Sequence, residues 1–175
     1  MHVVFAVVLT LLASLASAQD TRKQYSALPA CISGSDIDGN PTVGTAEEVI
    51  ATYTLPGNSL AVTNDGISFL FWGLAGDTSS KIVRARFGGL AGDILVAHTY
   101  ATAVAWRVEG IILRTGAATQ EAITSGLHAA GDYTVTRSTP AQTLSGNVDL
   151  VITVDDVDAG DTAWYGYRIC PLKAN

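Results

Sequence analysis

The clearest candidate for metal chemistry is an acidic run near the C-terminal end of the chain. Four carboxylates lie close together at Asp155, Asp156, Asp158 and Asp161. Oxygen ligands of this kind bind hard cations such as Ca²⁺. A charge run of this type is equally typical of a solvated surface loop. The sequence therefore offers a calcium site as one of two interpretations and predicts no other cofactor.

Two arginines form a second candidate site. Arg84 and Arg86 are two positions apart in an alternating run, so on a strand their side chains point the same way. One interpretation is a contact with an anion or a sugar acid. The other is a solvated face, or cross-strand ion pairs with Glu109, which contribute little to stability when exposed.

Aromatic residues form a third candidate site, because aromatic rings stack on sugars. Trp164, Tyr165 and Tyr167 follow the acidic run, and alternation places Trp164 on one face of a strand and the two tyrosines on the other. Trp72 and Tyr100 are further candidates. In a β protein such side chains also pack in the core, and that alternative stays open.

No catalytic constellation is recognisable. The histidines His2, His98 and His128 are scattered along the sequence, whereas a nucleophile needs a base within reach and acid–base chemistry needs paired groups. Neither a nucleophile-elbow motif nor a zinc-protease motif is present. We therefore do not expect an enzyme.

Composition predicts a folded, acidic domain. The 175 residues are 48% hydrophobic and 15% charged, with a formal net charge of -6. This is enough apolar material for a core and suits one domain. A non-specific nucleic-acid binder is usually basic, so that class is disfavoured.

The N-terminus resembles an export signal. Residues 3–15 are almost wholly apolar and are followed by Ala16-Ser17-Ala18, which has the small-residue pattern of a secretory cleavage site. The alternatives are an uncleaved anchor or a helix packed into a larger assembly. We expect three parts: an apolar helical segment over 1–18, an extended arm over 19–45 and a β domain over 46–175.

The two cysteines, Cys31 and Cys170, lie near opposite ends of the expected mature chain. In an exported protein this arrangement predicts one disulfide that ties the arm to the last strand. Two unrelated buried thiols are the alternative.

The elements that must position these residues are short strands. The central stretch, residues 65–116, contains at least three of them, and Ile67–Leu74 is apolar at nearly every position. Such a strand is covered on both faces or lies in a subunit contact, so Phe69, Phe71 and Trp72 are candidates for an oligomer interface. Turn signals roughly every 8–15 residues indicate an all-β antiparallel sandwich of jelly-roll type, with about eight or nine strands. The predicted strands are 47–56, 67–74, 81–88, 94–100, 103–115, 117–127, 132–137, 142–155 and 162–170.

Three motifs carry a family resemblance: Ala51 to Leu60, Asn64-Asp65-Gly66 leading to Lys81–Gly88, and Trp106-Arg107-Val108-Glu109 through Ala117. Together with the final strand they resemble the jelly-roll domains of tailed-phage virion proteins, of tail-fibre, head-fibre and decoration type. The resemblance implies a non-enzymatic, tumour-necrosis-factor-like homotrimer in the virion, with other virion proteins and a host-surface glycan as partners. The apolar leader supports an alternative, a secreted and prophage-derived carbohydrate-binding or adhesin domain.

Overall fold

The computed structural model describes residues 31–35, 46–76, 80–100, 103–128, 131, 133–155 and 162–174. These residues contain ten strands and no helix, so a membrane-spanning helix is not found among them. The strands are β1 (Ile32–Ser35), β2 (Glu48–Leu55), β3 (Gly66–Ala75), β4 (Lys81–Phe87), β5 (Asp93–Tyr100), β6 (Val104–Gly116), β7 (Thr119–His128), β8 (Tyr133–Ser138), β9 (Val148–Asp155) and β10 (Thr162–Leu172).

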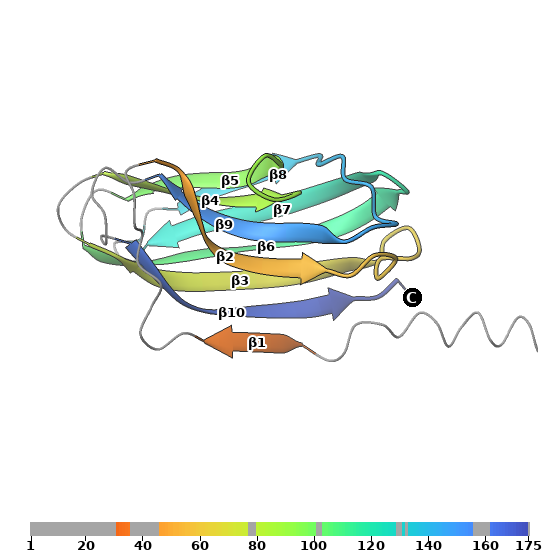
Figure 1. Cartoon of the computed structure of the whole chain (residues 1–175), viewed down its shortest axis with the longest axis horizontal. Coiled ribbons are helices and arrows are strands. Elements are labelled where there is room, and N and C mark those ends of the chain that lie inside the picture. The colour runs from red at the N-terminus through yellow and green to blue at the C-terminus, as the bar shows by residue number, and fades with distance from the viewer. Residues whose placement is uncertain are drawn as a thin grey trace, which may run out of the picture.

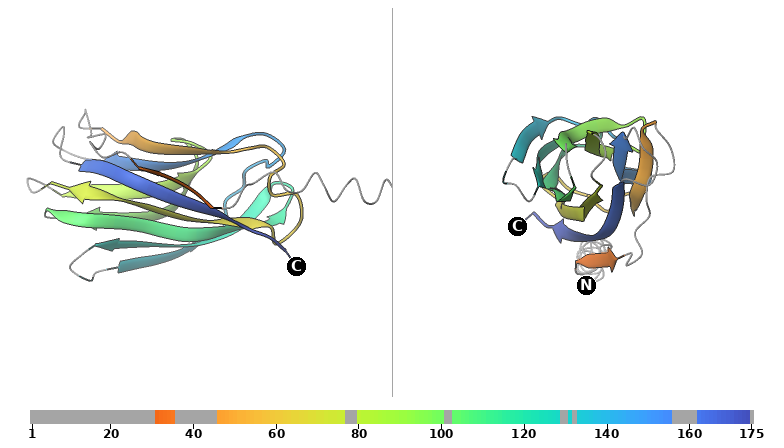
Figure 2. Two further views of the ribbon diagram at one scale, coloured as in Figure 1. Left: turned by 90° about the horizontal axis from the view of Figure 1, so that it is seen from below. Right: turned by 90° about the vertical axis from the view of Figure 1, so that its left-hand side faces the viewer.

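The strands form two antiparallel sheets that pack face to face (Figure 1). One sheet has six strands in the order β1-β10-β3-β6-β7-β8, and the other has four in the order β2-β9-β4-β5. Viewed along the strands, the two sheets wrap around a common interior (Figure 2). The predicted all-β antiparallel sandwich is therefore confirmed.

The strand pairing is nested along the sequence. β1 pairs with β10, β2 with β9, β3 with β6 and β4 with β5. A nested antiparallel ribbon that folds over into two sheets is the arrangement of a jelly roll, which contains two Greek keys. The β7–β8 hairpin lies outside this nest and is attached to the free edge of β6. It extends one sheet of the roll without changing the order of the other strands.

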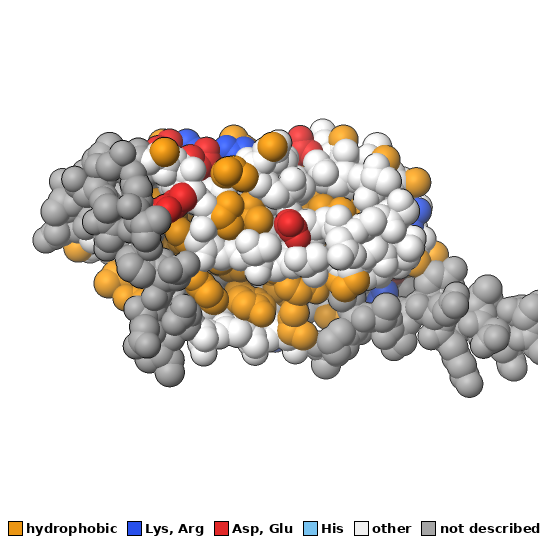
Figure 3. Space-filling model, in the orientation of Figure 1, with side chains coloured by type: hydrophobic (Ala, Val, Ile, Leu, Met, Phe, Trp, Pro, Cys, Tyr) orange, Lys and Arg blue, Asp and Glu red, His pale blue; other side chains and the backbone are white. Residues whose placement is uncertain are grey.

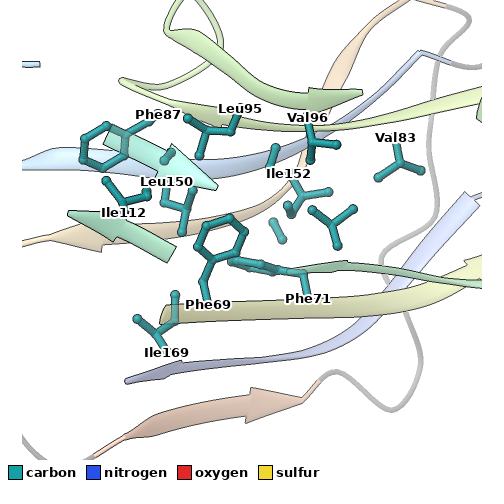
Figure 4. Close-up of a cluster of buried hydrophobic side chains, with 14 of the residues drawn as sticks. Phe69, Phe71, Val83, Phe87, Leu95, Val96, Ile112, Leu150, Ile152 and Ile169 are labelled. Carbon is teal, nitrogen blue, oxygen red and sulfur yellow. The ribbon is translucent and has the colours of Figure 1, made fainter. Parts of the chain in front are cut away.

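The core lies between the sheets and is built from alternate positions along the strands. On β4, Val83, Ala85 and Phe87 are fully buried, as their shared face predicts. Phe69 and Phe71 of β3 meet them from the other sheet (Figure 4). The strand candidates predicted from the sequence all correspond to observed strands.

One strand was not predicted. β1 lies in the segment expected to be an extended arm, and its residues Ile32-Ser33-Gly34-Ser35 carry too little apolar pattern to signal a strand. It pairs with β10 at the edge of the six-stranded sheet. The apolar segment 1–18 and most of the arm lie outside the described residues.

The expected oligomer interface needs correction. Phe69 and Phe71 are 3% and 0% exposed and belong to the core of a single chain, so neither is available to a second subunit. Only the opposite face of β3 points outward, with Trp72 half-buried and Leu74 44% exposed. The strand is apolar on both faces, but the chain covers only one of them fully.

β9 also differs from expectation. Its alternation predicts one buried face, and Leu150, Ile152 and Val154 are indeed buried. Val151 and Thr153, on the outward face, are buried too, at 3% and 0% exposed. Charged side chains of neighbouring segments cover this face, as described below.

Cys31 and Cys170 form a disulfide, as the export interpretation predicts. Cys31 directly precedes β1 and Cys170 lies on β10, and the pairing of Ile32 with Ile169 brings the two cysteines side by side, with their Cα atoms 4.0 Å apart. The bond links residues separated by 139 positions, so it joins the two ends of the nested ribbon.

Candidate functional site

A hollow lies on the outer face of the six-stranded sheet, and we call it the outer groove. Its volume is about 610 Å³, and it is open to solvent. It crosses β10, β3, β6, β7 and β8, so the added β7–β8 hairpin forms one of its two ends. The outward-facing residues that line it are Ser68, Leu70, Arg107, Glu109, Ile111, Ile123, Ser125, Val135, Arg168 and Cys170.

Strand register aligns these side chains in rows across the sheet. Along one row, Arg168 is opposite Leu70, Leu70 is opposite Glu109, Glu109 is opposite Ser125, and Ser125 is opposite Val135. Directly opposed residues in an antiparallel pair point to the same face. The row therefore runs from a cation, through an acidic and hydroxyl-bearing centre, to an apolar end.

The centre of the groove holds an ion pair. Arg107 Nε donates to Glu109 Oε2 at 3.1 Å. The two residues are neighbours on the same face of β6, and their side chains are 47% and 38% exposed. An exposed pair contributes little to stability, but it offers donors and acceptors to polar groups of a ligand.

Gly110, between Glu109 and Ile111 on β6, is explained by the close approach of the neighbouring strand β7. The pairing of β6 with β3 and β7 continues through it without a register shift. A Cβ atom there would lie 2.5 Å from Thr124 Cγ2 and 2.7 Å from the Ile123 carbonyl oxygen. A mid-strand glycine usually marks a bulge or a close backbone approach. Gly110 marks a close approach.

Trp72 does not line the groove itself, but it lies in the adjacent row, directly opposite the lining residue Arg107. It pairs with Arg107 on one side and with Gly166 on the other. Its ring covers Gly166, since a Cβ atom there would lie 2.4 Å from Trp72 Cζ2. The indole therefore lies against the sheet, and as a half-buried side chain it presents part of its ring to solvent.

The far end of the groove is apolar and exposed. Ile123 of β7 is 47% exposed, and Val135 and Tyr133 of β8 are 61% and 69% exposed. Alternation in the sequence predicts that Tyr133 and Val135 share one face of a strand. They do, and that face is exposed to solvent.

The arginines predicted as a ligand site lie elsewhere, on the outer face of the four-stranded sheet. Arg86 donates to both carboxylate oxygens of Glu47, at 2.8 and 2.9 Å. Arg84 lies 3.5 Å from Glu47 and 3.2 Å from Asp155. Their partners are not Glu109, as expected for an ion pair, because Glu109 is in the other sheet. Both guanidinium groups are therefore engaged, and they cover the outer face of β9.

Glu47 is the centre of this network. Thr153 Oγ1 also donates to it, at 2.6 Å. Burial raises the pKa of the Glu47 carboxyl, but the hydrogen bonds from Arg86 and Thr153 and the charge of Arg84 outweigh burial and hold the pKa below its ordinary value. Glu47 is thus a half-buried structural carboxylate.

The predicted aromatic site is corrected by a β-bulge. The β10–β3 register shifts between Trp164 and Gly166, which places Trp164 and Tyr167 on the same face instead of opposite faces. Both are partly buried and pack against the core, with their ring centroids 6.2 Å apart. Tyr165 is the residue at the bulge.

These aromatic rings fill the seam between the edges of the two sheets. Tyr167 lies 5.7 Å from Phe71 and 6.5 Å from Tyr53 of β2, centroid to centroid. Figure 3 shows hydrophobic side chains gathered along the band between β2 and β10. Tyr100, a further sugar-stacking candidate, is fully buried and donates to the Leu127 carbonyl oxygen. These rings stabilise the sandwich and offer little free surface for stacking.

The acidic run is described only at Asp155, whose carboxylate pairs with Arg84. Asp156, Asp158 and Asp161 lie outside the described residues. No group of three or more His, Cys, Asp or Glu side chains that could hold a metal ion is found within the described ranges.

Sequence reasoning did not find the outer groove. Its residues come from five strands and share no local motif. The available signal was the alternation in β6, which correctly placed Arg107, Glu109, Ile111 and Leu113 on the face opposite Trp106 and Val108. Alternation cannot show which neighbouring strands contribute to the same row.

No protein-family model and no curated protein matches this chain. Weak likenesses to solved structures exist, and three of them have TM-scores below 0.5. One is the CBM36-1 domain of a multidomain xylanase from the hindgut metagenome of Trinervitermes trinervoides, with TM-score 0.34, 11% identity, and 82% of this chain and 87% of that chain covered. Another is a carbohydrate-binding module, CBM36, in complex with calcium and xylotriose, with TM-score 0.31, 12% identity, and 81% and 99% covered. A third is infectious bursal disease virus, Gx strain, with TM-score 0.30, 12% identity, and 82% and 33% covered. None of them assigns a function to this chain.

Proposed function

We propose that this chain is an exported, non-catalytic binding module that holds a saccharide ligand in the outer groove. The observation that carries the proposal is the groove itself, an open hollow in which charged, hydroxyl and apolar side chains meet on one sheet face. Binding sites combine apolar surface with a few polar groups that fix orientation. Saccharides present both kinds of surface, since their hydroxyl groups are polar and their ring faces are apolar.

The Cys31–Cys170 disulfide supports the exported location. Disulfides persist in oxidising compartments and are rare in the cytosol. The apolar segment 1–18 and its small-residue site agree with the same location.

The roles of individual side chains follow from their chemistry. Glu109 accepts hydrogen bonds from sugar hydroxyls, and Arg107 donates to them. The exposed part of the Trp72 ring receives an apolar sugar face. No metal or organic cofactor is required for binding of this kind.

A binding screen with matched variants tests the proposal. The oxidised protein is screened against an array of soluble oligosaccharides, and hits are measured by calorimetry. We expect Trp72→Ala and Glu109→Gln each to weaken binding roughly tenfold. Leu74→Ala is the control, because Leu74 is exposed on the same face of β3 but pairs with Ala105, outside the groove lining, whereas Trp72 pairs with the lining residue Arg107. Binding that all three variants leave unchanged would place the ligand elsewhere and contradict the proposal.

A second candidate function is a homotrimeric subunit or receptor-binding module of a tailed-phage virion. It is favoured by the exposed apolar side chains of β8, an edge strand of the sheet, where Tyr133 and Val135 are 69% and 61% exposed. Light scattering separates the candidates. A binding module is expected to be a monomer whose mass is unchanged by Val135→Lys, whereas a trimer that this substitution dissociates would favour the virion subunit.

A further inference from the structure

Arg168 differs from the other basic side chains in the described part of the chain. It is exposed, and its recorded side-chain contact is weak, with Nη2 3.9 Å from Cys31 Sγ. Every other described lysine or arginine has a carboxylate or backbone carbonyl partner. These are Lys81, Arg84, Arg86, Arg107, Arg114, Arg137 and Lys173.

This uncompensated cation lines the outer groove. Arg168 is on the outward face of β10, opposite Ser33 of β1 and Leu70 of β3. Glu109 is the next residue along the same row, beyond Leu70. The carboxylate of Glu109 is engaged by Arg107 and is separated from Arg168 by an intervening strand.

The charge of the groove therefore opposes that of the protein. The whole chain carries a formal charge of -6. Within the groove lining, the charge of Arg107 is compensated by Glu109, and Arg168 leaves a local positive charge at the β10 end. A cation on an acidic protein attracts an anionic ligand to this place.

The structure points to a carboxylate as that anionic group. A guanidinium presents its N–H groups as a planar fork that matches two carboxylate oxygens. We propose that the outer groove binds a saccharide chain that contains uronic acid residues, and that Arg168 pairs with one of their carboxylates. This inference rests on the proposed saccharide-binding function and adds the chemical class of the ligand.

The groove distributes the remaining contacts along the chain of sugars. With one carboxylate at Arg168, the rest of the ligand crosses Leu70 and reaches the Arg107–Glu109 pair, where sugar hydroxyl groups find a donor and an acceptor. Ser68 and Ser125 add hydroxyl groups beside this path. Val135, at the apolar end, offers no charged partner. Only one carboxylate of the ligand therefore pairs with a cation, and the groove accommodates the other sugars without pairing their carboxylates.

The test compares charged and neutral forms of the same ligand. The probes are short oligomers of galacturonic, glucuronic and mannuronic acid, each beside its carboxyl-reduced form, in which a neutral hydroxymethyl group replaces the carboxylate. We expect the oxidised wild-type protein to bind at least one acidic oligomer roughly tenfold more tightly than its reduced form. We also expect this preference to shrink as the salt concentration rises.

Arg168 variants assign the preference to one side chain. Arg168→Gln is expected to abolish the preference for the acidic form, because the acidic oligomer loses its charged partner and its affinity falls to about that of the neutral form. Arg168→Lys keeps the positive charge but loses the planar guanidinium that can donate to both carboxylate oxygens. Part of the preference for the acidic form should therefore remain. Arg137→Gln is the control, since Arg137 is an exposed arginine of the same sheet that pairs with Glu121 and does not line the groove. Thermal melting verifies that each variant is folded.

The outcomes separate the two levels of the proposal. Equal binding of acidic and neutral oligomers, or a preference that survives Arg168→Gln, would overturn the assignment of a uronic acid and leave saccharide binding standing. Failure of every acidic and neutral oligomer to bind wild-type protein would contradict the acidic ligand. If the wider oligosaccharide screen also fails, the saccharide-binding function falls with it.

Discussion

At the scale of single residues, the most constrained carboxylate is Asp65. It is 2% exposed. One of its oxygens accepts hydrogen bonds from the backbone N–H groups of Ala61 and Val62, at 3.1 and 3.2 Å, and the other accepts one from Ala174 at 3.2 Å. Asp65 thus ties the turn before β3 to the C-terminal residues that follow β10.

Asp65→Asn should lower the free energy of unfolding by about 2–3 kcal/mol, because the amide NH₂ group cannot accept hydrogen bonds and a charge-assisted network is lost. Urea denaturation measures the change. Asp149→Asn is the matched control. Asp149 accepts one hydrogen bond from Thr54 at an exposed site, and its loss should cost less than about 1 kcal/mol. Equal effects would refute the role given to Asp65.

Acid pH should destabilise the protein through Glu47 and Asp65. Burial raises the pKa of Asp65, but the backbone N–H groups of Ala174, Val62 and Ala61 and the charge of Lys173 outweigh it, so its pKa, like that of Glu47, is lowered. A group with a lowered folded pKa contributes stability that is complete above its unfolded pKa, near 4, and disappears as pH falls through the folded pKa. We therefore expect thermal stability to fall below about pH 4.

Glu47→Gln should reduce this acid dependence and lower stability by about 2 kcal/mol at neutral pH, because Arg84 and Arg86 lose a shared carboxylate. Glu121→Gln is the control. Glu121 also pairs with an arginine, Arg137, but on the surface, where such pairs contribute little. Melting curves from pH 2 to pH 7 compare the variants. An unchanged acid slope in Glu47→Gln would argue against this role for Glu47.

At the scale of elements, β1 depends on a covalent bond more than on its own sequence. It has four residues and lies at a sheet edge. Cys31→Ser with Cys170→Ser should cost roughly 3–5 kcal/mol, the loop-closure entropy of a long disulfide loop. Hydrogen exchange should show lost protection in β1, with β3 and β6 still protected. Unchanged protection of β1 in the double variant would contradict this dependence.

The elements also show what sequence patterns can predict. Alternation identified strands such as β4 and β9, which have one face in the core, and Val83, Ala85 and Phe87 illustrate the signal well. β3 was found from its continuous apolar run, and β7 from its place between turn-bounded strands. Sequence patterns missed β1, whose Gly34 lies against the ring of Tyr167 and whose residues show no apolar alternation. Alternation also reversed Trp164 relative to Tyr167, since one bulged residue changes which face every later residue points to.

The functional site was harder to predict for a related reason. Arg84 and Arg86 look available in sequence, yet Glu47 and Asp155 engage them. Arg168 carries no special signal in sequence, and only the register of β10 between β1 and β3 places it at the groove. Whether a charged residue is paired depends on neighbours that are distant in sequence, and one strand's periodicity does not contain that information.

At the scale of the whole molecule, the nested pairing predicts slow folding. β1 must find β10 and β2 must find β9, so the outermost contacts join residues from opposite ends of the chain. Non-local pairings of this kind fold in milliseconds to seconds. With the disulfide intact, the two ends are already joined, and refolding from urea should be faster than for the reduced chain. Stopped-flow fluorescence of both forms measures this, and equal rates would indicate that β1–β10 pairing forms after the rate-limiting step.

The same disulfide has a mechanical consequence. A pulling force applied at residues 30 and 174 enters the domain at Cys31 and leaves through Cys170, so the covalent bond carries it past the 139 positions between them. The force still loads the few residues after Cys170, where Leu172 pairs with Gly66 and Ala174 donates to Asp65, but the chain between the two cysteines cannot be extended, although roughly 450 Å of it is stored there. Reduction of the disulfide would release that length, so the domain is inextensible between its cysteines when it is oxidised and extensible when it is reduced.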